Sequence, residues 1–197
     1  MSHRFQGYTL ALALVLQSSA VHGGAGPVVT SPLVFVPPSV FADIDGPKTA
    51  SKSETDQIAR RIQAAVSLCS GVGGPYRVDC LADQLANTAA SLPDTGDYAA
   101  AKVAIEDAAK RLHALARANA DRSAPRVTAK MGDVTTSRPI IPVAPEALAD
   151  VNVQADAILS EAATVLLRSA DSSPQLQDDY VQIATAIGST KVLLRST

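Results

Sequence analysis

The residues with the clearest potential for chemistry are the only two cysteines of the chain, Cys69 and Cys80. Ten residues separate them, and the glycine-rich segment 71–74 between them suits a reversal of the chain. Catalytic redox pairs usually have the spacing Cys-x-x-Cys, and two cysteines do not complete a tetrahedral zinc site. We therefore expect a structural disulfide, which for a loop of this size stabilises a fold by roughly 3 kcal/mol.

His113 is the one histidine in the region that we expect to be helical. A catalytic base needs a nucleophile beside it, and the sequence contains no Gly-x-Ser-x-Gly motif. Segment 71–74 lacks the Gly-Lys-Ser/Thr ending of a phosphate-binding loop. The adjacent carboxylates at 106–107 and 178–179 point in different directions on a helix, so neither forms an acid–base pair. We expect no enzymatic activity, no cofactor and no bound metal.

Charge is distributed unevenly, although the net charge is only −2. Residues 110–138 contain seven basic and two acidic side chains, whereas residues 142–179 contain one basic and seven acidic side chains. The basic stretch either binds an anionic partner, such as a lipid head group, an acidic glycan or an acidic protein face, or lies across the acidic helices of its own chain. Exposed ion pairs of the second kind contribute only about 0–1 kcal/mol each. The candidate contact residues are Arg117, Arg122, Arg126, Lys130 and Arg138.

Residues 1–20 have the layout of a secretory signal peptide. Arg4 precedes the apolar run Tyr8–Leu16, and small residues follow, which predicts cleavage after Ala20 or, as a weaker alternative, after Ala25. This apolar run is too short to span a membrane, which takes about 20 residues in a helix. We therefore expect no transmembrane segment once the signal peptide has been cleaved. The abundance of alanine, and of arginine over lysine, is typical of GC-rich bacterial genomes. We therefore expect a periplasmic location, with an extracellular one as the alternative.

The elements that must position these residues are predicted to be helices. Residues 21–50 are rich in proline and glycine and are expected to form an extended or disordered arm. Apolar residues at helical spacing then predict helices over 51–70, 75–92, 98–120, 145–170 and 173–194. Ser51 and Glu54 have capping-box spacing, and Asp97 is a candidate cap of the third helix. Residues 123–144 are expected to form a long basic loop.

The predicted fold is all-α, an antiparallel bundle of about five helices over residues 51–197 with a proline-rich N-terminal arm. The near-neutral net charge gives no case for a nucleic-acid partner. The preferred functional hypothesis is an exported, non-catalytic helical protein that acts through contacts with an unknown protein or envelope component. The alternative is a periplasmic small-ligand binding protein with a pocket between its helices.

Overall fold

The computed structural model describes residues 49–171, 174 and 176–195. These residues are mostly helical, which confirms the predicted predominance of helix. The predicted signal peptide (1–20) lies outside the described residues, as does all of the predicted arm (21–50) except its last two residues. The helices are α1 (Lys52–Ser70), α2 (Arg77–Ala90), α3 (Ala99–Ala118), α4 (Leu148–Asp171), α5 (Gln177–Ser189) and α6 (Val192–Arg195), with single 3-10 turns at Gly74–Tyr76 (η2) and Pro145–Ala147 (η3).

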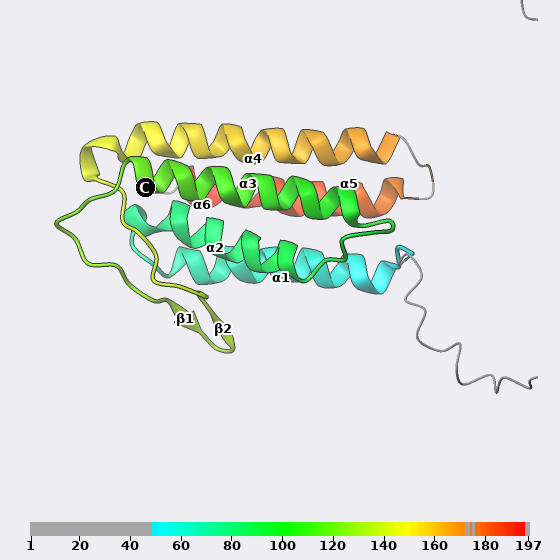
Figure 1. Ribbon diagram of the computed structural model, residues 1–197, viewed down its shortest axis with the longest axis horizontal. Helices are drawn as coiled ribbons and strands as arrows, with labels where there is room; N and C mark the ends of the chain where they lie inside the picture. Colours follow the sequence, from blue (N-terminus) through cyan, green and yellow to red (C-terminus); the bar gives the residue numbers. More distant parts are fainter. Residues whose placement is uncertain (1–48, 172–173, 175, 196–197) are drawn as a thin grey trace, which may run out of the picture. The chain divides into compact units, whose positions relative to one another are not determined.

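The long helices lie side by side (Figure 1). Helix α4 packs against α3 and α5, α1 packs against α2 and α5, and α2 packs against α3. The connection between α3 and α4 lies at one end of this arrangement, and the start of α1 lies at the other end (Figure 1).

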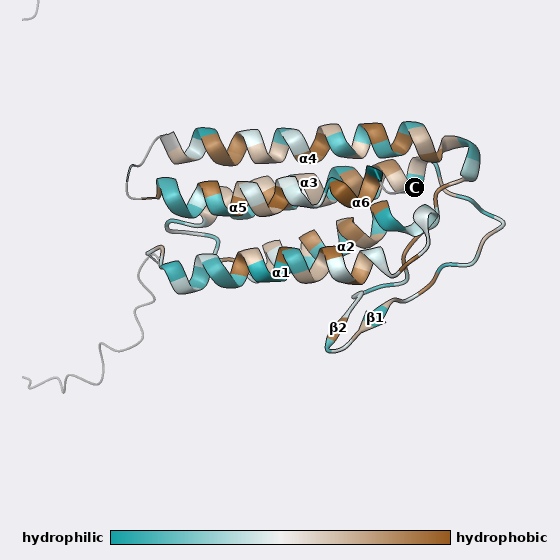
Figure 2. Ribbon diagram, turned by 180° about the vertical axis from the view of Figure 1, so that it is seen from behind, coloured by the Kyte–Doolittle hydropathy of each residue, from teal (hydrophilic) through white to brown (hydrophobic). Residues whose placement is uncertain are grey.

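Each long helix carries both hydrophobic and hydrophilic residues along its length, because one side is buried (Figure 2). Most of the buried side chains are apolar residues at helical spacing, although Val165 of α4 is 40 % exposed. Helix α3 buries mainly alanines, which add little apolar area but let neighbouring helix backbones approach closely. Fully buried large side chains include Ile62, Leu81, Leu85, Ile105, Leu112, Leu159, Leu166, Ile183 and Ile187.

The start of the described chain is held by residues that precede α3. The Asp97 carboxylate accepts a hydrogen bond from the Ala50 amide at 2.8 Å, and the Ser51 amide donates to the Tyr98 hydroxyl at 3.0 Å. The predicted role of Asp97 as the cap of the third helix is therefore wrong, because its side chain serves the entry to α1 instead. At that entry, the Ser51 hydroxyl caps α1 by accepting from the Glu54 amide at 3.3 Å.

The segment between α3 and α4, residues 119–144, is called here the hairpin segment, because the long basic loop predicted at 123–144 contains two short strands. Strands β1 (Lys130–Met131) and β2 (Val134–Thr135) form an antiparallel hairpin, with Met131 opposite Val134. Gly132 has φ +59° in the two-residue turn between them, a conformation that glycine adopts without strain. Flanking bridges join Val127 to Ile140 and Ala120 to Val143, so the two halves of the segment pair with each other.

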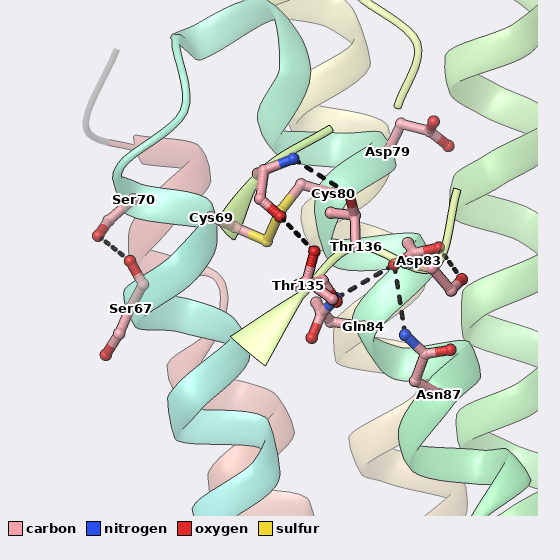
Figure 3. The surroundings of a disulfide bond; sticks show 12 residues. Ser67, Cys69, Ser70, Asp79, Cys80, Asp83, Gln84, Asn87, Thr135 and Thr136 are labelled. Atoms are coloured by element: carbon pink, nitrogen blue, oxygen red, sulfur yellow. Dashed lines mark hydrogen bonds between the residues drawn. A yellow bond between two sulfur atoms is a disulfide. The ribbon is translucent and has the colours of Figure 1, made fainter. Parts of the chain in front are cut away.

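The predicted disulfide between Cys69 and Cys80 is confirmed, with 5.7 Å between the two Cα atoms. It joins the last turn of α1 to α2, and Thr135 and Thr136 of the hairpin segment lie beside it (Figure 3). Both cysteines are fully buried, and they share an apolar cluster with Ala129 and Ile140 of the same segment. The disulfide thus forms part of the surface on which the hairpin segment rests.

Candidate functional site: a basic pocket around His113

Two buried carboxylates on α2 hold the hairpin segment in place. Asp79 and Asp83 are one helical turn apart, and they are 0 % and 2 % exposed. A buried charge is costly unless partners satisfy it, so the surroundings of these two side chains are strongly constrained. Neither residue stands out in the sequence as a candidate for a site.

Asp79 accepts hydrogen bonds on both oxygens. Arg138 donates from Nη1 to Oδ2 at 2.7 Å and from Nη2 to Oδ1 at 2.8 Å, and the Ile141 amide donates to Oδ2 at 2.7 Å. Burial acts to raise the pKa of Asp79, but hydrogen bonds from Arg138, His113 and the Ile141 amide outweigh it and hold this pKa below its usual value. Asp79 is therefore an ionised acceptor at neutral pH.

Asp83 binds the same segment one turn further along α2. Its carboxylate accepts from the Ser137 amide at 2.9 Å and from the Ser137 hydroxyl at 2.5 Å. Gln84 and Asn87 also donate to Asp83, at 3.1 and 3.3 Å (Figure 3). Together the two carboxylates fix residues 137–141 against α2.

His113 projects from α3 toward the Asp79 carboxylate. Its Nδ1 lies 2.6 Å from Oδ1 of Asp79 and 2.9 Å from Nη2 of Arg138, so this nitrogen faces both an ionised acceptor and a guanidinium donor. Because Nδ1 is engaged in this cluster, Nε2 is the ring nitrogen left for a ligand. The His113 side chain is 33 % exposed. What the sequence did not reveal is the Asp79 partner that orients the ring.

A pocket of about 350 Å³ lies next to His113. We call this cavity the basic pocket; it is lined by His113, Arg117, Arg126, Arg138, Pro139 and Ile141. Arg117 follows His113 by one turn of α3 and so lies on the same face. Arg126 is carried by the hairpin segment, where the Tyr76 hydroxyl donates to the neighbouring Pro125 carbonyl at 2.7 Å. The structure thus brings together three of the predicted contact residues around one pocket.

The arginines of the basic pocket differ in their partners. Arg138 is bound to Asp79, whereas Arg117 and Arg126 are exposed and make no hydrogen bond or ion pair with the described residues. The remaining predicted contact residues, Arg122 and Lys130, are exposed but do not line this pocket. The unpaired positive charge of the site is therefore contributed by Arg117 and Arg126.

A second cavity, of about 480 Å³, runs between α2 and α3. We call it the α2–α3 groove; its alanines are Ala82, Ala86, Ala89, Ala90 and Ala109, and its polar lining is Lys102, Glu106, Lys110, His113 and Arg138. His113 and Arg138 line both the groove and the basic pocket, so the two cavities adjoin.

The basic stretch, residues 110–138, was predicted either to bind an anionic partner or to lie across the acidic helices of its own chain. The observed contacts of its basic residues can be compared with both alternatives. Arg111 reaches Glu161 of the acidic stretch at 2.7 Å, as expected if basic residues pack on the acidic helices of their own chain. Arg138 instead pairs with Asp79 of α2, which lies outside that acidic stretch. Arg117 and Arg126 contact neither the acidic stretch nor a buried carboxylate of the described chain, and they remain available to a partner.

The part of the chain that the structure describes contains no group of three or more His, Cys, Asp or Glu side chains placed to hold a metal ion. None of its helices is long and apolar enough to span a membrane. No family model, curated protein or solved structure matches this chain.

Proposed function

We propose that this chain is an exported, non-catalytic helical protein that acts by contact, and that its basic pocket binds an anionic group on an envelope component or a protein. The observation that carries the proposal is the pair of unpartnered guanidinium groups, Arg117 and Arg126, beside one cavity. Guanidinium groups bind carboxylates and phosphates through paired, charge-assisted hydrogen bonds.

The wall of the pocket that His113 and Arg138 form is held in place by contacts within the protein. Asp79 holds the guanidinium of Arg138 and the ring of His113, and Asp83 holds the backbone at Ser137. A binding site whose groups are already ordered loses less conformational entropy when it binds. This order supports a role in recognition.

A catalytic role has less support from the same residues. Asp79 and His113 have the arrangement of a base and the carboxylate that orients it, and such a pair requires a nucleophile within reach. Neither the basic pocket nor the α2–α3 groove includes a serine, threonine or cysteine in its lining. The geometry therefore favours binding over covalent catalysis.

Export to the periplasm is part of this proposal. It is supported by the signal-peptide layout of residues 1–20 and by the disulfide, which is stable in oxidising compartments. We further propose that the helices form an antiparallel bundle that serves as a rigid scaffold.

The test compares two double variants in an envelope-binding assay. R117Q/R126Q removes the unpartnered charges of the basic pocket, and R60Q/R168Q removes two exposed arginines of α1 and α4 as a charge-matched control. Co-sedimentation with the native envelope fraction is expected to fall strongly for the first variant, and in high salt for all proteins, because such contacts are screened. Equal sedimentation of both variants would contradict the proposal.

The second candidate function is binding of a small ligand between the helices. The α2–α3 groove favours it, since its volume of about 480 Å³ lies within the range of about 300–1,000 Å³ that is usual for ligand pockets. Native mass spectrometry of protein purified from its own cells tests this candidate by detecting a co-purifying small molecule.

A further inference from the structure

We propose that the α2–α3 groove and the basic pocket form one site for an anionic amphiphile with a single hydrocarbon chain. The acidic head group would lie between Arg117 and Arg126, and the chain would lie along the groove. This inference rests on the proposed function, because the same arginines receive the anionic group.

The charges along the groove neutralise one another. Lys102 Nζ lies 2.6 Å from the Asp94 carboxylate and also donates to the Leu92 carbonyl at 3.1 Å. Lys110 Nζ lies 2.7 Å from the Glu106 carboxylate, and the hydrogen bond from Lys110 lowers the pKa of Glu106. Among the described residues, the charged side chains Lys102, Glu106 and Lys110 of the groove are therefore all paired, up to the end of the groove at His113.

Alanine side chains leave the space that a hydrocarbon chain would fill. Ala82, Ala89 and Ala109 are buried at the base of the groove, whereas Ala86 and Ala90 are exposed at its edge. Contact with a hydrocarbon chain would remove the exposed surface of Ala86 and Ala90 from water, which stabilises a complex by about 25 cal/mol per Å².

The length of the groove suits a single hydrocarbon chain. The groove extends along α3 from Lys102 to His113, which at a rise of 1.5 Å per residue is ~16 Å. A chain laid along the groove would run parallel to α3 and bring its charged end to His113.

The positive end of the site is continuous with the groove. His113 and Arg138 line both cavities, and Arg117 and Arg126 lie beyond them in the basic pocket. A ligand with its charge at one end and an apolar chain at the other matches this arrangement. A small inorganic anion would use only the basic pocket, and a neutral amphiphile would use only the groove.

The test is a calorimetric titration with three probes: decyl phosphate, decyl maltoside and inorganic phosphate. The two decyl compounds are used below their critical micelle concentrations. We expect decyl phosphate to bind at least about tenfold more tightly than either other probe, since it engages both halves of the site. R117Q/R126Q is expected to weaken decyl phosphate binding by about tenfold, because it removes the charged head-group contacts.

The groove itself is tested with A86L, which places a larger side chain at an exposed edge without altering the core. It is expected to weaken decyl phosphate binding but not phosphate binding, and A157L, at an exposed position of α4 outside the groove, is the matched control. Equal binding of phosphate and decyl phosphate would overturn this inference while leaving the proposed anion site intact. Absence of binding by both anions would contradict the inference and the anion site of the proposed function together.

Discussion

The guanidinium of Arg138 and the carboxylate of Asp79 pair through two hydrogen bonds, at 2.7 and 2.8 Å, although 59 residues separate them in sequence. The pair joins α2 to the segment between α3 and α4, and it lies at the boundary of the basic pocket. The same contact therefore stabilises the fold and positions the site.

Replacing Asp79 by asparagine is expected to destabilise the protein by about 3 kcal/mol, because breaking a buried ion pair leaves its partner uncompensated. Urea unfolding with the disulfide intact measures the change. The matched control is D107N, which alters an exposed carboxylate 3.4 Å from Arg111 and should cost about 0.5 kcal/mol or less. Similar unfolding free energies for D79N and D107N would contradict the role assigned to Asp79.

The pH dependence of stability should reveal the same carboxylate. The pKa of Asp79 is lowered in the folded state, so the unfolded chain binds more protons in acid, where its Asp pKa is about 3.9. The stabilisation is fully present above about pH 5 and is lost as the pH falls through the folded pKa. Unfolding free energy measured between pH 2 and 6 should fall less steeply for D79N than for the unaltered protein. Parallel curves would show that Asp79 does not carry this effect.

Removal of the disulfide is expected to act on the hairpin segment as well as on the whole fold. The double variant C69S/C80S should lose roughly 3 kcal/mol of stability, because the unfolded chain regains the entropy of an open loop. Trypsin should also cut sooner at Arg126 and Lys130, since the apolar cluster beneath that segment includes both cysteines. Cleavage of C69S/C80S that begins outside the hairpin segment would contradict the expected effect on that segment.

Two glycines test the conformation of the backbone with the same substitution. A methyl group at Gly132 would meet nothing within 4 Å, but φ is +59° there, so G132A should destabilise by about 1 kcal/mol. Gly188 lies in α5, also with open space, so G188A should stabilise by about 0.5–1 kcal/mol. Thermal unfolding measures both, and shifts of the same sign would be inconsistent with the hairpin turn.

The helices and the disulfide could be predicted because their signals are local. Apolar residues at helical spacing located α1 to α4 to within a few residues, and the 11-residue separation of the cysteines suited a turn between two helices. The predicted fifth helix, 173–194, is instead divided into α5, which ends at Ser189, and α6, which begins at Val192. The hairpin was missed because strands of two residues cannot show alternation. The Gly132-Asp133 pair was the one signal for its turn.

The candidate site was harder to predict because its residues are distant in sequence. Asp79 reads as a polar residue near the start of an amphipathic helix, and its partners lie 34 and 59 residues away. Charge counting identified Arg117, Arg126 and Arg138 but could not show that only Arg138 has a buried partner. That distinction depends on how the hairpin segment folds back onto α2.

The central claim is that Arg117 and Arg126 bind an anionic group in the basic pocket. Its most direct test is an NMR titration with decyl phosphate that follows the arginine Nε–Hε signals and the ring signals of His113. We predict saturable shifts for Arg117, Arg126 and His113, with Arg60 and Arg168 unchanged. Equal, non-saturating shifts for all arginines would show general charge screening and would contradict the claim.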